Sequence, residues 1–473
     1  MLTPKLNLQL DPHSRKPLAE QIRSGILEAI ESGVLEPDSR LPSWNDLASQ
    51  LGVARGTVKA AYERLSDDQA VVASPSMGTR VARRPSPMKP AAARDDGSGL
   101  PDFYHQLSAG SVMFQMGIPA PETFPAKLFS KIRVRAIRKE SATAPAYPDP
   151  RGEFSFRSQI AAYLALGRSM RCEPSQVFIT QGFAGGLTFV LRVLNMSGQT
   201  AWIEDPCYPI SRHALELAGI SPCPVRVDVN GMDVGFGIQA APRASLVLTT
   251  PGQQAPLGMT MSLERRVELT QWAEENGAWI IEDDYLGEMQ LEGRASPALA
   301  SLDPTRVIHI GTFSKTISPA LRLGFVVVPP SLVARFAEAA IYAWPAPGPS
   351  VQYTVTDFIQ DGHYLRHLRK VRRDYAEKRE LLSEAIQRIG LPASPAGLSV
   401  VVRLPEAVSD VDIARSALRF GMAPAPLSPW FISPTSVGSG LLLGAPNVNP
   451  KTLDSYCERI KRLIDKGSTA TLV

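Results

Sequence analysis

Residues 307–322 read V-I-H-I-G-T-F-S-K-T-I-S-P-A-L-R, an apolar run that leads into a lysine within a polar turn. The run Val307–Ile310 predicts a buried strand, and Lys315 comes just after it. Lysines are rarely buried without a partner, because an ammonium group loses its hydration there. A Schiff base with a carbonyl cofactor would remove that cost. Taken alone, however, the stretch favours an ordinary lysine in a surface loop.

Apolar runs and helix-like segments alternate along the chain on both sides of this lysine. The strand candidates are Val177–Thr180, Ala201–Glu204, Ser245–Thr249, Ala278–Glu282, Val307–Ile310 and Gly324–Val328. Helices are expected between them, for example over Leu263–Asn276. This alternation predicts an α/β domain whose mostly parallel sheet is covered on both faces. A long helical stretch over 351–389, followed by shorter signals, predicts a smaller α+β lobe.

Two further features fall where ligands gather in a parallel sheet, at the carboxyl ends of strands. The run from Ala278 ends in Glu282, Asp283, Asp284 and Tyr285, and a carboxylate there can keep a pyridine nitrogen protonated. The glycine-rich stretch 182–186, G-F-A-G-G, opens the helix after the first strand, where backbone N–H groups suit a phosphate. Neither a G-x-G-x-x-G fingerprint nor a Walker sequence occurs.

Composition limits the class of protein. The 473 residues are 44% hydrophobic, which is enough for a large core, and the length predicts about three domains. Four cysteines without a C-x-x-C pair exclude a disulfide scaffold. No apolar run reaches 18 residues and the N-terminus lacks a secretory signal, so we expect a soluble, cytoplasmic protein without a membrane span. His363 and His367 have a metal-binding spacing, but a solvated helix face is the favoured interpretation.

A stretch rich in proline, alanine and charge, Arg83–Gly99, divides the chain. We place a small domain at 1–82, a linker at 83–105 and a large domain at 106–473. The small domain shows three helical patterns, the second beginning after Ser43, and then two short strands around a turn at residues 75–78. Three helices and a hairpin predict a winged helix-turn-helix.

The third helix of that domain begins with residues suited to DNA. Arg55, Thr57 and Lys59 point outward at its start, where a recognition helix meets base edges and phosphates. Ser43 and the wing residue Arg80 complete the expected contacts with double-stranded DNA, and the pair at 83–84 adds phosphate contacts. The alternative is a solvated helical domain with ordinary surface charges. The net charge of +4 is too small to decide between them.

The N-terminal sequence resembles the GntR family of bacterial repressors. The matching runs are P-L-A-E-Q-I from Pro17, G-V-L-E-P-D-S-R-L-P-S from Gly33, and L-A-S-Q-L-G-V-A-R-G-T-V-K-A-A-Y-E-R-L from Leu47. The resemblance implies an operator as partner. The family usually has arginine at the position of Asn45 and arginine or serine at that of Trp44. Trp44 would therefore either pack or touch DNA, and we favour packing.

The features around Lys315 resemble the fold-type I aminotransferases, and the whole chain resembles the MocR subfamily of GntR regulators. The implied cofactor is pyridoxal 5′-phosphate, and the implied assembly is a domain-swapped homodimer. The resemblance assigns Lys315 to the internal aldimine, Asp283 to the pyridine nitrogen, Tyr285 to the phenolic oxygen and Tyr208 to the ring face. It assigns the phosphate to Thr312, Arg322 and the backbone of Gly182, Phe183 and Ala184, with Tyr147 reaching the partner's phosphate. Tyr208 as a core aromatic and Tyr285 as a structural cap remain the alternatives.

Three positions depart from the aminotransferase pattern. Ala255 stands where an asparagine usually binds the phenolic oxygen, and Phe183 stands where a serine usually binds the phosphate. Leu442 takes the place of the arginine that binds the α-carboxylate of an amino acid. Without that bidentate clamp, ordinary transamination is not expected.

These observations favour a transcription regulator over an enzyme. In this interpretation the aminotransferase-like domain senses pyridoxal phosphate itself, or a small amine, through the Lys315 aldimine. The alternative is an active aminotransferase with an appended DNA-binding domain, which the retained Lys315, Asp283 and Arg322 would permit. A third hypothesis is a regulator with a degenerate scaffold that binds no cofactor.

Overall fold

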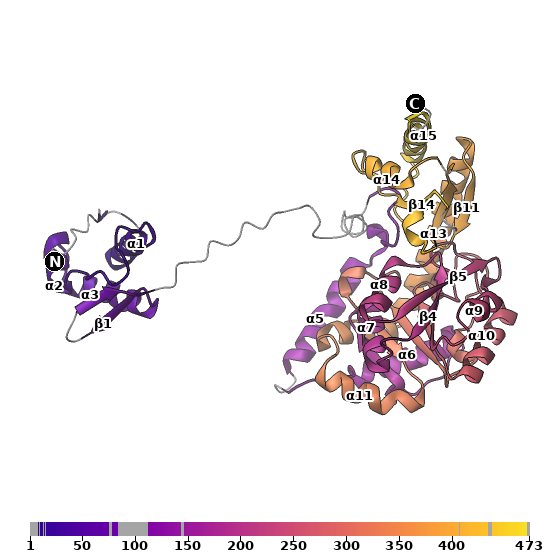
Figure 1. Ribbon diagram of the computed structural model, residues 1–473, viewed down its shortest axis with the longest axis horizontal. Helices are drawn as coiled ribbons and strands as arrows, with labels where there is room; N and C mark the ends of the chain where they lie inside the picture. Colours follow the sequence, from indigo (N-terminus) through magenta and orange to yellow (C-terminus); the bar gives the residue numbers. More distant parts are fainter. Residues whose placement is uncertain are drawn as a thin grey trace. The chain divides into compact units, whose positions relative to one another are not determined.

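The computed structural model describes residues 8, 10–12, 14, 16–74, 78–83, 112–142, 146–405, 407–433 and 438–470, with side chains described to 467. The chain forms two compact units, an N-terminal unit (1–99) and a C-terminal unit (100–473) (Figure 1). The expected linker, apart from Arg83, and residues 75–77 of the expected turn lie outside the described residues. None of the helices in the described ranges has the length and apolar character that a membrane span requires.

The N-terminal unit is a small helical domain with a hairpin. Its elements are α1 (Leu18–Glu31), α2 (Trp44–Leu51), α3 (Arg55–Asp67), β1 (Val71–Ser74) and β2 (Gly78–Val81). Gly52, with φ +65°, ends α2, and its N–H donates to the carbonyl of Ala48. Ile22, Val58 and other apolar residues from the three helices and both strands form one buried core. The prediction of a winged helix-turn-helix is confirmed.

The large lobe of the C-terminal unit is built on an eight-stranded sheet. In spatial order the strands are β3 (Val177–Thr180), β10 (Gly324–Val327), β9 (Val307–Thr312), β8 (Trp279–Asp284), β7 (Leu246–Thr249), β4 (Thr200–Asp205), β5 (Ser221–Asp228) and β6 (Gly231–Met232). The pairings from β9 through to β5 are parallel, whereas β10 runs antiparallel to both its neighbours and β6 is antiparallel to β5. The predicted mostly parallel sheet is confirmed.

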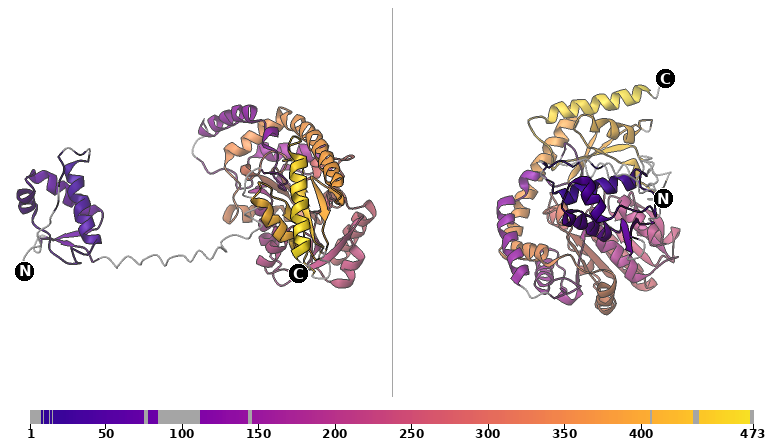
Figure 2. Two further views of the ribbon diagram at one scale, coloured as in Figure 1. Left: turned by 90° about the horizontal axis from the view of Figure 1, so that it is seen from above. Right: turned by 90° about the vertical axis from the view of Figure 1, so that its left-hand side faces the viewer.

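Strands β3, β4, β7, β8, β9 and β10 bury side chains on both faces of the sheet, since successive side chains point to opposite sides. Strand β5 is partly exposed. On β10, Phe325 and Val327 pack into one core while Val326 packs into the other. The first core includes residues of α6 (Phe154–Gly167), α10 (Leu263–Asn276) and α12 (Pro349–Gln360). The second includes residues of α7 (Gly182–Leu194), α8 (Pro209–Leu217) and α11 (Val333–Tyr342). Helices therefore cover both faces of the sheet (Figure 2).

The small lobe is an antiparallel sheet with helices packed against it. Its strands, in order, are β11 (Ala393–Ala396), β12 (Ser399–Arg403), β14 (Gly440–Gly444) and β13 (Ala425–Pro426), and its helices are α14 (Asp410–Leu418) and α15 (Leu453–Ala470).

The C-terminal unit has further helices besides α13, which is described below. They are α5 (Ala126–Ala142), α9 (Val234–Ala240), η1 (Pro121–Thr123), η2 (Pro174–Gln176), η3 (Gly287–Met289), η4 (Leu299–Ser301), η5 (Pro319–Leu321), η6 (Pro330–Leu332) and η7 (Ser428–Trp430).

A long helix connects the two lobes. The helical stretch predicted over 351–389 consists of two helices, because α12 ends at Gln360 and α13 begins at His363 and runs to Arg388. Gly362, with φ +69°, breaks the run in a conformation that glycine adopts more readily than other residues. Tyr364 of α13 packs in the large-lobe core, and Ile386 packs in the small-lobe core.

Candidate functional site

Lys315 lies in the turn after β9. Its amine forms a hydrogen bond with the segment that precedes η1. Its Nζ donates a hydrogen bond of 2.7 Å to the carbonyl oxygen of Gly117. Burial lowers the pKa of Lys315 to about 8, although the charge of Asp283 opposes the shift. An amine with a pKa near neutral is more often uncharged, and therefore more nucleophilic, than a surface lysine.

Asp283 is a buried carboxyl group on the neighbouring strand, β8. Burial raises its pKa well above the usual value, and the charges of Asp284 and Glu204 raise it further, while Lys315 lowers it. Its Oδ1 is buried and makes no hydrogen bond within the described part of the chain. An unsatisfied buried oxygen is costly, so this atom suits a donor from a ligand. A protonated pyridine nitrogen is such a donor, and the site therefore fits the pyridoxal group that the sequence suggests.

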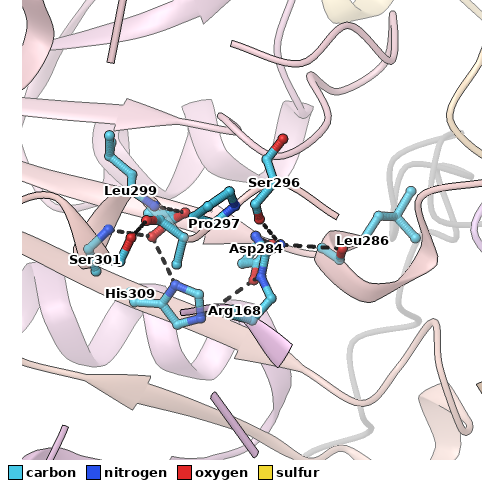
Figure 3. A network of polar contacts seen from close by, with 12 residues as sticks. Arg168, Asp284, Leu286, Ser296, Pro297, Leu299, Ser301 and His309 are labelled. Atoms are coloured by element: carbon cyan, nitrogen blue, oxygen red, sulfur yellow. Dashed lines mark hydrogen bonds and ion pairs between the residues drawn. The ribbon is translucent and has the colours of Figure 1, made fainter. Parts of the chain in front are cut away.

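A network of buried charges lies on the opposite face of the same strands (Figure 3). Arg168 donates to both carboxylate oxygens of Asp284, at 2.9 and 3.0 Å, and also to backbone carbonyls. His309, opposite Glu282 in the β8–β9 register, lies 2.9 Å from that carboxylate and 3.6 Å from Asp284. The N–H groups of Leu299 and Ala300 also donate to Glu282. The network holds the two neighbours of Asp283 and so fixes the strand that carries it.

The pKa values in this network reflect its pairing. Burial opposes ionisation of Glu282. The charge and hydrogen bond of His309, the charge of Arg168 and the N–H of Leu299 together outweigh burial and lower the pKa of Glu282 to about 2. Burial lowers the pKa of His309, but the carboxylates of Glu282 and Asp284 outweigh burial and hold it above its usual value. Both groups are therefore favoured in their charged forms.

Aromatic side chains gather around the same space. The Tyr208 ring lies 6.2 Å from the ring of Phe183 and 5.7 Å from that of Trp430, measured between centroids. Burial raises the pKa values of Tyr208 and Tyr285, and the charge of Asp283 adds to both shifts. Both rings pack against one cluster of buried apolar residues. The structure thus places Tyr208 and Tyr285 in one cluster, within the electrostatic influence of Asp283.

The expected phosphate ligands meet at the start of α7. Gly182 has φ +72°, and an added Cβ there would come within 3.8 Å of the Arg322 guanidinium. Arg322 itself donates to the carbonyl of Gln181 at 3.3 Å. Phe183 and Ala184 follow in the first turn of α7. Helix N-termini with a nearby guanidinium suit phosphate groups.

Two further expected phosphate ligands, Thr312 and Tyr147, come from other parts of the chain than the start of α7. The Thr312 hydroxyl accepts from the N–H of Ser314 and donates to its hydroxyl. Tyr147 is fully exposed and contacts none of the residues above. The structure of one chain therefore does not bring Tyr147 into the site.

The small lobe presents an apolar face to the site. On β14, Leu442 is buried together with Ala255, Trp430, Tyr208 and Tyr285, whereas its neighbours on the strand pack into the core of the small lobe. The two positions at which aminotransferases usually carry asparagine and arginine thus belong to one apolar cluster.

Sequence reasoning missed several residues of the site. Gly117 is distant in sequence and reaches Lys315 only through the folding of the chain. The expectation of a solvated face is wrong for His367, which is buried and lies 2.7 Å from the carbonyl oxygen of Thr316, next to the lysine. The spacing of His363 and His367 was the only local signal. Nothing in the local sequence around Arg168 or His309 indicated that these residues are buried, because charged residues are expected at the surface.

In the N-terminal unit, the expected DNA-binding residues lie on α2, α3 and β2. Ser43 caps α2 and accepts from the N–H of Asp46 at 3.2 Å. Arg55 and Lys59 are exposed and Thr57 is half-buried in the first turns of α3. Arg80 donates to the carbonyl of Asp38 at 2.7 Å, so part of its guanidinium is already engaged.

Trp44 differs from the favoured expectation. Its side chain does not join the buried core of the N-terminal unit, and the residue is 46% exposed. The Nζ of Lys59 lies 5.4 Å from the centroid of its ring, within the range of a cation–π interaction. Trp44 therefore lies beside Lys59 on the surface, where the expected recognition residues are found.

Comparison with known families divides the chain as the fold does. The family described as bacterial regulatory proteins, gntR family, matches residues 18–81. The family described as aminotransferase class I and II matches residues 114–423. The structure is similar to LysN, an α-aminoadipate aminotransferase from Thermus thermophilus solved with N-(5′-phosphopyridoxyl)-L-leucine. The TM-score is 0.70 at 25% identity, covering 79% of this chain and 96% of that one.

Two relatives are similar over nearly their whole length. The probable rhizopine catabolism regulatory protein MocR of Rhizobium meliloti is 32% identical over 464 residues, 94% of this chain and 93% of that protein. The uncharacterized HTH-type transcriptional regulator YhdI of Bacillus subtilis is 32% identical over 461 residues, 96% and 97% of the two chains. The chain therefore belongs to the MocR-type HTH transcriptional regulators, in which a GntR-type DNA-binding domain is joined to an aminotransferase-like domain.

Proposed function

We propose that the C-terminal unit binds pyridoxal 5′-phosphate as a sensor and that its occupancy changes how the protein binds its operator. The observation that carries the proposal is a buried amine and a buried carboxyl that lie at or just beyond the ends of neighbouring strands. The amine of Lys315 has a lowered pKa, and the Oδ1 of Asp283 has no hydrogen-bond partner among the described residues. When bound, the cofactor supplies an aldehyde that condenses with a primary amine. Lys315 would hold that carbon and Asp283 the ring nitrogen.

The other residues would orient the cofactor and keep water away. Tyr208 would cover one face of the ring, and Tyr285 would donate to its phenolic oxygen. Thr312, Arg322 and the start of α7 at Gly182, Phe183 and Ala184 would bind the phosphate. Tyr147, fully exposed in one chain, would reach the phosphate of a second subunit in a domain-swapped homodimer.

The apolar face of the small lobe supports sensing over transamination. Leu442 and Ala255 offer no charged or hydrogen-bonding side chain to an α-carboxylate. A carboxylate buried against them would lose its hydration without a partner, which is strongly unfavourable. The effector would therefore be pyridoxal phosphate itself or a small amine without that carboxylate, in a cytoplasmic protein.

Spectroscopy of the full-length protein tests this proposal. Addition of pyridoxal phosphate should produce a visible absorbance band, and Lys315→Ala should abolish it while leaving DNA affinity measurable. Lys370→Ala, an exposed lysine on α13, controls for random reaction with surface amines and should keep the band. A visible spectrum unchanged in Lys315→Ala would reject the lysine assignment. Absence of a band in the wild type would favour a regulator without cofactor.

Turnover decides between the sensor and the enzyme. A single-turnover experiment with a set of amino acids should leave the spectrum of the bound cofactor unchanged. Conversion of an amino donor to its keto acid would instead favour an aminotransferase with an appended DNA-binding domain.

A further inference from the structure

One helix of the C-terminal unit concentrates positive charge. The 17 residues of α5 contain six Lys and Arg and one acidic residue, Glu140. The basic residues are Lys127, Lys131, Arg133, Arg135, Arg138 and Lys139. Over residues 95–473 the charges nearly cancel, with 37 Lys and Arg against 36 Asp and Glu. The charge of α5 is therefore a local feature and not the consequence of a basic domain.

The helical period sorts these cations by face. Phe129, Ile132 and Ala136 are buried and attach α5 to the large lobe. At 3.6 residues per turn, Lys127, Lys131 and Arg138 lie on the side opposite to that buried face, and all three are exposed. Helix α5 lies along the outside of the C-terminal unit (Figures 1 and 2).

These three cations are not neutralised by the part of the chain that the structure describes. None of them forms an ion pair with any described residue, whereas Arg135, at the side of the helix, pairs with Asp357 and Asp361 of the α12 end. With a rise of 1.5 Å per residue, the row from Lys127 to Arg138 is about 16 Å long. A DNA strand carries one negative charge per roughly 3.4 Å of helix axis, so a row of that length spans about five phosphates of one strand.

We propose that this face of α5 binds the phosphate backbone of DNA, as a second contact for the duplex bound by the N-terminal unit. The inference rests on DNA binding by the winged helix, which brings a polyanion to the same chain at high local concentration. A membrane surface is disfavoured, because the apolar side of α5 is buried in the large lobe. Val134 and Ile137 are the half-exposed large aliphatic side chains of α5, which is too little apolar surface for insertion into a bilayer.

The salt dependence of binding tests the inference directly. We would measure binding of the full-length protein to a 60-base-pair duplex of mixed sequence by fluorescence anisotropy at 50 to 200 mM salt. The slope of log affinity against log salt is negative, and each phosphate contact contributes about −0.9 to it. The triple variant Lys127→Gln, Lys131→Gln, Arg138→Gln should make this slope less negative by about 2.7. Between those two salt concentrations, the wild type should therefore lose about 40-fold more affinity than the variant.

Two controls separate this contact from charge in general and from the winged helix. The variant Arg243→Gln, Arg294→Gln, Lys451→Gln removes the same charge from exposed positions elsewhere on the C-terminal unit and should keep the wild-type slope. The variant Arg55→Ala, Lys59→Ala tests the winged helix alone. If it weakens binding while the α5 variant keeps the wild-type slope, the inference fails and DNA binding by the N-terminal unit stands. If neither weakens binding, both fail.

Two other results would also overturn the inference. A change in oligomeric state of the α5 variant, measured by light scattering, would assign this face to a subunit contact. Loss of binding to phosphatidylserine vesicles with unchanged binding to DNA would assign it to a membrane surface. The far-ultraviolet circular dichroism of the variant should match the wild type, since all three side chains are exposed.

Discussion

Replacing Gly117 by alanine places one methyl group directly beside the amine of Lys315. An ideal Cβ at residue 117 would lie 2.6 Å from Nζ and 3.5 Å from Cε. Ordinary contacts to a Cβ begin at about 3.4 Å, so the amine must move by about 0.8 Å. The hydrogen bond of 2.7 Å from Nζ to the carbonyl of Gly117 would then break or distort.

The cost has two parts that can be worked separately. Gly117 has φ +70°, and an alanine in that region costs about 1 kcal/mol. A lost hydrogen bond from a charged group costs about 1.5–3 kcal/mol. The second part falls on the unliganded protein and lowers its thermal midpoint. The displacement of the amine by about 0.8 Å, and not the lost hydrogen bond, is what should weaken the affinity for pyridoxal phosphate, because the reacting nitrogen leaves its position.

Gly198→Ala is the matched control, because Gly198 has φ +80° and an added Cβ there meets nothing within 4 Å. This control should lose only the stability that corresponds to the positive φ, about 1 kcal/mol. The assays are thermal unfolding without cofactor and an absorbance titration with pyridoxal phosphate. Gly117→Ala should have the lower midpoint and the weaker affinity of the two. Equal midpoints and equal affinities in the two variants would refute the reasoning that Gly117 positions Lys315.

Three further predictions concern other parts of the chain. Arg168→Met leaves the buried carboxylate of Asp284 without its bidentate partner and should destabilise the protein by about 3–5 kcal/mol, seen as a lower thermal midpoint. Because the pKa of His309 is raised in the folded state, its contribution to stability is present below pH 6.5 and is lost as pH rises through the raised pKa. His309→Gln should therefore show a flatter decline of the thermal midpoint above pH 6.5 than the wild type. Ser43→Ala removes the N-cap of α2 and should cost about 1 kcal/mol, measured on the unfolding transition of the N-terminal unit.

Much of the fold was predictable because the period of apolar residues follows secondary structure. The predicted helix Leu263–Asn276 has the bounds that the structure gives to α10, and the predicted strands differ from the observed ones by a residue or two. The break at Gly362 in the helical stretch predicted over 351–389 could not be foreseen. A single glycine in the left-handed conformation interrupts a helix without disturbing the apolar pattern around it. The antiparallel direction of β10 was not predictable either, since one strand has the same pattern in both directions.

The sequence by itself determined where Lys315 and Asp283 stand relative to the strands. Each of them stands at the carboxyl end of an apolar run, and a parallel sheet places those ends at one edge. Only the tertiary structure decided what surrounds them. Gly117 lies far from Lys315 in the chain, and Arg168 lies far from Asp284. Such contacts depend on the packing of distant segments, and the energetic cost of a buried charge is visible only once its partner and its solvent exposure are known.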